Sequence, residues 1–240
     1  MIWTLLQVEF AKLKGTLAIV LCVTAPVVAT TMAGLIALRQ TPASADAMMT
    51  QVAALWAYFV MPMSIAALSA LIAQLEHGPR MWDHLLALPI SRAQLFLAKA
   101  LTMAILVGAM TVALVPLSFL ASVVLAALKS SAPSPLSFNW LNAATLAGLM
   151  WLASFAVCAL QLWTALRFRS FVAPVLLGLV GTFAVVAGMG AKELVFVPWA
   201  MPMNMLPFDH ANPSLVLMLG AVGGACVLAL MTLDLSTREI

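Results

Sequence analysis

Charged side chains are scarce in this sequence. Lys, Arg, Asp and Glu make up 8% of its 240 residues, whereas 65% are hydrophobic. A soluble domain carries roughly a quarter charged residues. The deficit excludes an ordinary soluble fold and indicates that lipid surrounds most of the chain. The net charge of +3 gives no sign of nucleic-acid binding, because in a membrane protein the position of each basic residue matters more than the sum.

Features typical of enzymes and metal sites are also missing. The three cysteines (Cys22, Cys158, Cys226) lie inside apolar runs, far from any His or Cys at metal-ligand spacing, so we expect free buried thiols. No ionisable residue stands in the middle of a long apolar run, which argues against an intramembrane protease or a proton-coupled carrier. Gln161, the main strongly polar residue within a run, is expected to hydrogen-bond a neighbouring helix. We therefore expect no catalytic residue, no bound cofactor and no metal.

Long apolar runs dominate what is present. A helix needs about 20 apolar residues to cross the hydrocarbon core, and six runs qualify. We predict an all-α membrane protein with one permease-type domain over residues 1–240, and we expect Pro26, Pro62, Pro116 and Pro174 to lie inside spans. The predicted spans are Leu17–Leu38, Val52–Leu75, Phe96–Leu128, Trp140–Leu166, Phe171–Ala191 and Ser214–Leu233.

The basic residues predict an orientation. With six spans both termini share one side, and that side would hold eight basic residues against three on the other. Cytoplasmic segments are enriched in Lys and Arg, so we expect both termini in the cytoplasm of a bacterial inner membrane. The outer loops are then Arg39–Gln51, Lys129–Asn139 and Lys192–Pro213. The last (192–213) is proline-rich yet apolar, as in VPWAMPMNMLPF, and is expected to lie at the outer interface or re-enter the membrane.

The N-terminal segment (1–15) is expected to form an amphipathic elbow helix. Ile2, Leu5, Leu6, Phe10 and Leu13 recur at helical spacing, and Lys12 and Lys14 lie mostly away from this stripe. Such a helix rests in the interface with its lysines toward anionic lipid. The alternative is that it extends the first span, although Gly15 favours a bend.

One cytoplasmic window (76–95, continuing to Lys99) gathers many of the charges, in EHGPRMWDHLLALPISRAQLFLAK. Gly78-Pro79 ends the second span, and a short helix with Trp82, Leu85 and Leu86 follows. Pro89 ends that helix. Ser91 and Gln94 then form a capping box, flanked by the hydrophobic staple of Ile90 and Leu95. The window is thus predicted to be a rigid corner whose apolar face needs a partner.

This window resembles the first cytoplasmic loop of ABC transporter permeases of the type-2 exporter family, most nearly the branch with the bacitracin- and lantibiotic-immunity permeases. An N-terminal elbow, six spans and an apolar segment before the last span also fit that family. The resemblance implies a coupling helix that docks on a separate ATPase subunit. The residues that match the family pattern are Glu76, Trp82, Leu85, Leu86, Pro89 and Arg92.

The resemblance also implies partners. No GxxxxGK[ST] loop occurs in the sequence, so ATP and Mg²⁺ would bind a partner subunit. Six spans make half of a typical pathway, which implies a second permease chain in a homo- or heterodimer. We expect outward transport of an amphipathic or lipid-soluble substrate, for example a peptide antibiotic, which would confer antibiotic resistance. The alternatives are a non-transporting membrane scaffold or sensor that recruits a cytoplasmic protein, and a membrane enzyme acting on lipid.

Three further patterns leave alternatives open. The small residues of Gly178–Gly181 and Gly220–Gly224 could face a partner permease or a span of the same chain. Met201, Met203 and Met205 could offer thioethers to Cu(I) or simply fill apolar space. Arg167 and Arg169 are expected to anchor the topology, with contact to the ATPase as the second reading.

Overall fold

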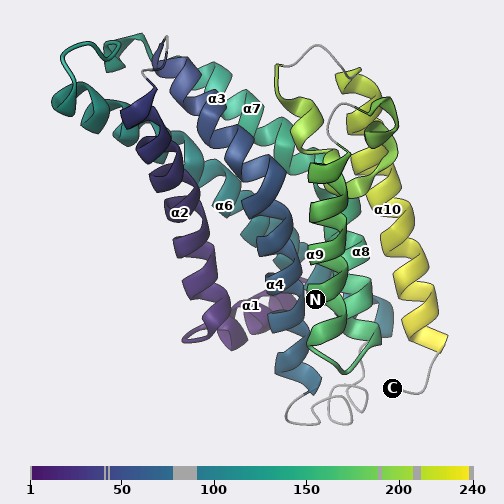
Figure 1. Cartoon of the computed structure of the whole chain (residues 1–240). Coiled ribbons are helices and arrows are strands. Elements are labelled where there is room, and N and C mark those ends of the chain that lie inside the picture. The colour runs from purple at the N-terminus through teal and green to yellow at the C-terminus, as the bar shows by residue number, and fades with distance from the viewer. Residues whose placement is uncertain are drawn as a thin grey trace.

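The computed structural model describes residues 2–40, 42, 44–77, 91–188, 191–207 and 212–237, and all regular structure in these ranges is helical (Figure 1). Four short helical turns lie at one end of the bundle: η2 (Pro135–Ser137), η3 (Lys192–Phe196), η4 (Pro198–Ala200) and η5 (Met203–Met205). The longer elements are α1 (Ile2–Leu13), α2 (Leu17–Arg39), α3 (Ala45–Leu55), the π-helix η1 (Trp56–Val60), α4 (Met61–His77), α6 (Arg92–Leu128), α7 (Trp140–Ala153), α8 (Phe155–Arg167), α9 (Val172–Ala187) and α10 (Pro213–Thr237).

The chain runs back and forth between two ends of one helical bundle. In Figure 1 the upper end holds η2 to η5, and the lower end holds α1 together with the ends of α4, α8 and α10. Within the described residues four helices are long and apolar enough to cross a membrane, or five if the bent pair α7–α8 is one span. At 16 residues α9 is about 24 Å long, shorter than a usual span. A multi-pass membrane protein is therefore confirmed, and the count of six spans stays a prediction.

The second span begins earlier than predicted. Residues 45–51 were expected in an outer loop, but α3 already starts at Ala45, with the hydroxyl of Ser44 accepting from Ala47 N at 3.0 Å. The helix then continues through η1 to His77. The π-turn is closed by Met61 N donating to Trp56 O, just before Pro62, which has no N–H to offer. Pro26, Pro62, Pro116 and Pro174 all lie inside helices, as predicted.

The fourth span is bent, which the sequence analysis did not anticipate. The helices α7 and α8 meet at Ser154 with an angle of 42°. The Ser154 hydroxyl donates to Trp151 O at 2.6 Å, a backbone-directed bond that bends helices. The bend lies against α10, where a Cβ on Gly220 would approach the Ala153 carbonyl oxygen to 2.7 Å. With no proline there, the sequence carries no strong signal for this bend.

Glycines allow the helices to pack within this chain. A Cβ on Gly178 of α9 would lie 2.2 Å from Ala66 Cβ on α4, and one on Gly224 of α10 would lie 2.7 Å from the Phe155 carbonyl carbon. Gly181 similarly makes room for the Trp199 ring. The intramolecular reading of these small residues is therefore the one that the contacts support.

The N-terminal helix is present, but its polar face is not where the pattern placed it. α1 packs against α6, and its fully buried positions are Glu9 and Leu13. The Lys12 side chain is only 19% exposed and contacts carboxylates, so the expectation that it faces lipid headgroups is wrong. Gly15 has φ +75, a left-handed conformation that lets the chain turn sharply from α1 into α2.

The proline-rich segment before α10 folds onto the bundle. Its turns η3, η4 and η5 contact α7, α8, α9 and α10. Ala200, Met201, Met205 and Leu206 are buried, which matches the expectation that this stretch is too apolar for a free loop. The methionines fill core space here, and its position relative to a membrane surface stays a prediction.

Candidate functional site: a buried ion-pair ring beside residues 78–90

Most long-range polar contacts of the described residues gather at the lower end of the bundle (Figure 1), where α1, α4, α6, α8 and α10 come together. The basic residues that the structure describes lie at the two ends of the bundle as the sequence predicted. One end holds Lys12, Lys14, Arg92, Lys99, Arg167 and Arg169, and the other holds Arg39, Lys129 and Lys192.

Four side chains from three helices form a closed ring of alternating charge, which we call the ion-pair ring: Glu9 and Lys12 of α1, Glu76 of α4 and Lys99 of α6. The Lys99 Nζ atom lies 2.7 Å from Glu76 Oε1 and 3.0 Å from Glu9 Oε2. Lys12 Nζ closes the ring at 2.8 Å from Glu76 Oε1 and 3.1 Å from Glu9 Oε1. Each ammonium thus touches both carboxylates.

The ring contains two positive and two negative side chains and is almost completely excluded from solvent. The Lys99 and Glu76 side chains are 0% exposed and that of Glu9 is 6% exposed. Isolated charges at such sites are costly, and only close pairing with an opposite charge offsets the loss of water. Burial acts to lower the pKa of Lys12, but its hydrogen bond to Glu76 and the charges of Glu9 and Glu76 outweigh burial and raise this pKa. Lys12 therefore stays charged at neutral pH.

One oxygen atom of the ring has no hydrogen-bond donor among the described residues. Glu76 Oε2 is buried and accepts no hydrogen bond from the described residues, whereas Glu76 Oε1 accepts from both lysines. A buried acceptor without a donor costs about 1–3 kcal/mol. Lys99 and Lys12 together neutralise the two carboxylates, and removing either lysine would leave both buried carboxylates with a single ammonium between them.

The ring lies at the base of segment 78–90. Glu76 is the second-last residue of α4, and Lys99 is two turns into α6, so these residues lie on the two helices that enter and leave segment 78–90. Glu9 and Lys12 add α1 to the same junction. The ring thereby fixes both stems of the segment to each other and to the N-terminal helix.

Other contacts join the helices at the end of the bundle that holds the ring. Arg92 Nη1 donates to Ser236 O at 3.0 Å, which joins the start of α6 to the end of α10. His77 Nε2 lies 3.3 Å from Ala165 O, and Arg167 pairs with Asp234, whose Oδ2 also accepts from Trp163 Nε1 at 2.9 Å. Arg167 thus has an intramolecular partner. These contacts tie α4, α6, α8 and α10 together beside the ring.

The residues assigned to ATPase coupling from sequence are divided by the structure. Trp82, Leu85, Leu86 and Pro89 lie outside the described residues. Glu76 is fully buried in the ring, so its side chain holds the base of the segment and offers no surface to a partner. Arg92 is half-buried against α10.

The predicted helix start after the segment is confirmed in part. Ser91 Oγ accepts from Gln94 N at 3.3 Å at the N-terminus of α6. The return bond of the capping box is missing, because Gln94 Oε1 is buried and accepts no hydrogen bond from the described residues. Ile90 of the proposed staple lies outside the described residues.

Sequence reasoning missed the ring. Glu9 was not singled out, and Lys99 was counted as a loop charge. A usable signal was present: Glu9 and Lys12 are spaced i, i+3 on a helix, and Lys99 stands in an apolar stretch where an unpaired charge is costly. The long-range pairing itself depends on tertiary packing.

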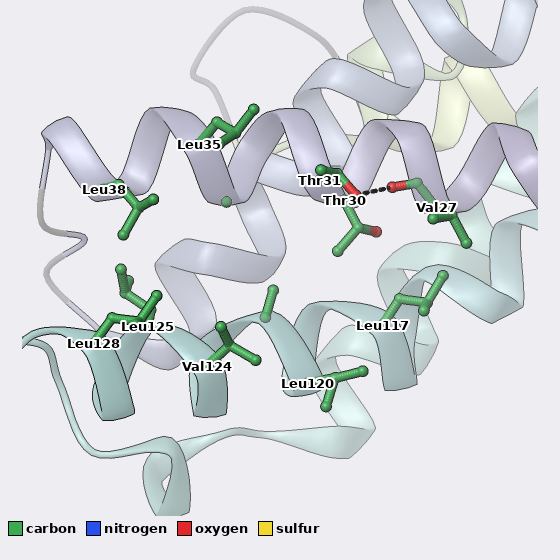
Figure 2. A pocket seen from close by; sticks show the side chains of 12 residues that line it. Val27, Thr30, Thr31, Leu35, Leu38, Leu117, Leu120, Val124, Leu125 and Leu128 are labelled. Atoms are coloured by element: carbon green, nitrogen blue, oxygen red, sulfur yellow. Dashed lines mark hydrogen bonds between the residues drawn. The ribbon is translucent and has the colours of Figure 1, made fainter.

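A groove between α2 and α6 is apolar and has a volume of about 320 Å³. In Figure 2 Leu38 of α2 points toward Leu125 and Leu128 of α6. The hydroxyls of Thr30 and Thr31 in this groove donate to their own helix, to Pro26 O and Val27 O. The groove therefore directs no unsatisfied donor toward its contents, as expected of a wall that faces acyl chains.

No group of three or more His, Cys, Asp and Glu side chains that could hold a metal occurs in the part of the chain that the structure describes. The three cysteines are free; Cys158 is buried as expected, and Cys226 is exposed. The buried Gln161 amide lies against α9. Its oxygen accepts from Gly178 N at 3.0 Å, and its nitrogen donates to Pro174 O at 2.9 Å. The interhelical role predicted for Gln161 is confirmed.

A family model described as "ABC-2 family transporter protein" matches residues 5–185, about three quarters of the chain. The chain belongs to the ABC-2 transporter family. No curated protein matches the chain in sequence. The matched region includes the ion-pair ring and the window 76–95. Membership supports a transmembrane ABC transporter subunit, a permease, and implies association with ATP-binding cassette subunits.

Proposed function

We propose that this permease is the membrane subunit of an ATP-driven exporter in a bacterial inner membrane, and that ATP is hydrolysed on a separate partner subunit. Segment 78–90, with Trp82, Leu85, Leu86 and Pro89, receives the motion of that partner. Both termini lie in the cytoplasm, the chain crosses the membrane six times, and it works with a second permease chain.

The observation that carries this proposal is the ion-pair ring. A coupling segment transmits force only if its two stems move together, and Lys99 on α6 binds Glu76 on α4 with both side chains excluded from water. Glu9 and Lys12 extend the clamp to α1. Motion applied to segment 78–90 would therefore move three helices as one body.

The orientation rests on the basic residues. The end of the bundle with the ring also holds Lys14, Arg92, Arg167 and Arg169, and Lys and Arg favour the cytoplasmic side. Partner ATPases reside in the cytoplasm, so this is the side on which segment 78–90 must lie.

The nature of the substrate follows from the walls between the helices. The groove between α2 and α6 is aliphatic, and its hydroxyls are already bonded to the helix backbone. Such a wall suits an amphipathic or lipid-soluble molecule better than a hydrophilic solute. A peptide antibiotic fits this description, in keeping with the resemblance to bacitracin- and lantibiotic-immunity permeases.

Affinity purification of the full chain from its own membranes in mild detergent tests the proposal. We expect a co-purifying protein with a phosphate-binding loop and ATP hydrolysis in the eluate. Trp82→Ala and Leu86→Ala should each reduce recovery of that protein several-fold. Leu136→Ala is the matched control, because Leu136 is exposed at the opposite end of the bundle.

The same preparation separates the ring from the docking surface. Glu9→Gln should retain the ATPase subunit but lower the amount of substrate moved per ATP hydrolysed, because α1 is no longer fixed to both stems. A co-purifying protein without ATP hydrolysis would instead favour the scaffold or sensor reading. Recovery of the ATPase that is unchanged by Trp82→Ala and Leu86→Ala would contradict the assignment of this segment.

A further inference from the structure

A second site lies at the opposite end of the helix that carries Glu76. A cavity of about 230 Å³ opens between α3, α7 and η5, and its lining combines the polar residues Asp46, Thr50, Asn142 and Thr145 with apolar residues that include Leu146, Leu149 and Met205. In Figure 1 the helices α3 and α7 lie side by side at the upper end of the bundle. The lining is thus partly polar and partly apolar.

Three of the polar lining residues present acceptors, beside the Asn142 amide. Thr50 Oγ1 already donates to Asp46 O at 3.1 Å, and Thr145 Oγ1 donates to Leu141 O at 2.8 Å, so each hydroxyl oxygen can only accept from a ligand. Asp46 Oδ1 accepts from Asn139 N at 2.8 Å, which fixes the carboxylate at the cavity wall. Of the residues that line the cavity, Asp46 is the one with a charged side chain.

A cavity whose lining holds a fixed carboxylate and two hydroxyl acceptors complements a cationic donor. A primary ammonium offers three N–H donors, and the leucines and methionine of the lining suit an apolar chain attached to it. A metal ion fits less well, because Asp46 supplies the one carboxylate and the lining has no His or Cys.

We propose that this cavity binds the cargo, and that the cargo is a cationic amphiphile whose primary ammonium contacts Asp46. This assignment rests on the proposed export function and adds the chemical class of the substrate. It also places cargo and coupling site on one element, since α3, η1 and α4 form a continuous helix from Ala45 to His77.

That helix has a point at which it can bend. The π-turn Trp56–Val60 and Pro62 lie between the cavity and the ion-pair ring, and π-bulges frequently mark functional sites in helices. Binding at Asp46 and motion at Glu76 could therefore influence each other through one helix of about 50 Å.

Photolabelling of the full chain tests the site. The probe is an alkylamine with a diazirine in its chain, and the comparison is the alkyl alcohol of the same length. The protein is placed in phosphatidylcholine nanodiscs, whose lipid carries no primary ammonium. We expect the amine to label peptides of α3 and α7 and the alcohol to label them weakly.

Variants then test the role of the carboxylate. Asp46→Asn keeps an oxygen that can accept from Asn139 N but removes the charge, and it should weaken amine binding about tenfold or more. Thr145→Val should weaken it less, without touching the Asn139 contact. Glu193→Gln removes an exposed charge from η3 at the same end of the bundle, outside the cavity, and should leave labelling unchanged.

Two results would overturn the assignment. One is that the amine labels Asp46→Asn as strongly as it labels the unchanged protein, or that the alcohol labels the unchanged protein as strongly as the amine does. The other is full competition by phosphatidylethanolamine at its membrane abundance, which would make a lipid headgroup the occupant. The labelling needs no ATPase, so its outcome is independent of whether segment 78–90 couples to one.

Discussion

Lys99 Nζ of α6 lies 2.7 Å from Glu76 Oε1 of α4, and both side chains are completely excluded from solvent. The pair joins the helix that enters segment 78–90 to the helix that leaves it. A salt bridge at this depth is costly to form and more costly to break on one side only. We therefore expect the stability of this end of the permease to depend on this buried pair.

Replacing Lys99 by Met should strongly destabilise the protein. The substitution keeps the length of the side chain but leaves the carboxylates of Glu9 and Glu76 with Lys12 alone, and breaking a buried pair costs about 3–5 kcal/mol. Thermal unfolding in detergent micelles should show a clearly lower midpoint. Adding Glu76→Gln to Lys99→Met restores charge balance and should recover part of the loss.

Arg167→Met is the matched control for Lys99→Met. Its pair with Asp234 also joins two helices at the same end, but the Arg167 side chain is 32% exposed. Exposed pairs contribute about 0–1 kcal/mol, so the midpoint should change little. Equal losses in Lys99→Met and Arg167→Met would contradict the importance given to the buried ring.

Gly178→Ala should disturb packing inside a single chain. The added Cβ would lie 2.2 Å from Ala66 Cβ and 3.0 Å from the side-chain amide of Gln161, so α4, α8 and α9 would have to move apart. Overpacking of this kind costs about 1–3 kcal/mol. Gly223→Ala is the control, because a Cβ there meets nothing within 4 Å. If Gly223→Ala lowered the stability of the isolated chain and Gly178→Ala did not, this packing arrangement would be refuted.

Gly15→Ala should lower stability through the backbone alone. Gly15 has φ +75 and nothing lies within 4 Å of a Cβ at this position, so no clash contributes. A left-handed conformation costs an L-residue about 1–2 kcal/mol. Gly34→Ala also adds a methyl group in open space, but inside helix α2, and should cause no loss. Circular dichroism during thermal unfolding compares the two, and an unaltered midpoint in Gly15→Ala would argue against a sharp turn here.

Long apolar runs were enough to predict a helical, multi-pass membrane protein, because a run of about 20 apolar residues has few alternatives to a membrane helix. The start of α6 was also predictable, since Ser91 caps its own helix through a local bond. The early start of α3 at Ala45 was missed, although Ser44 and Asp46 are a typical N-cap and first-turn acid. Local signals such as these are readable when they are sought.

The ring could not be predicted in the same way. Glu9 and Lys99 are 90 residues apart in sequence, and their contact exists only because α1 packs against α6. The bend at Ser154 likewise depends on α10 lying against it through Gly220. Features that arise from packing between distant segments leave little trace in one sequence.

The central claim is that segment 78–90 contacts a nucleotide-hydrolysing subunit in the cytoplasm. A photocrosslinking amino acid at position 86 in the assembled complex tests it most directly, with adducts identified by mass spectrometry. The account predicts an adduct with a protein that carries a phosphate-binding loop, and no such adduct from position 136. An adduct with lipid alone, or accessibility of position 86 only from outside the cell, would contradict it.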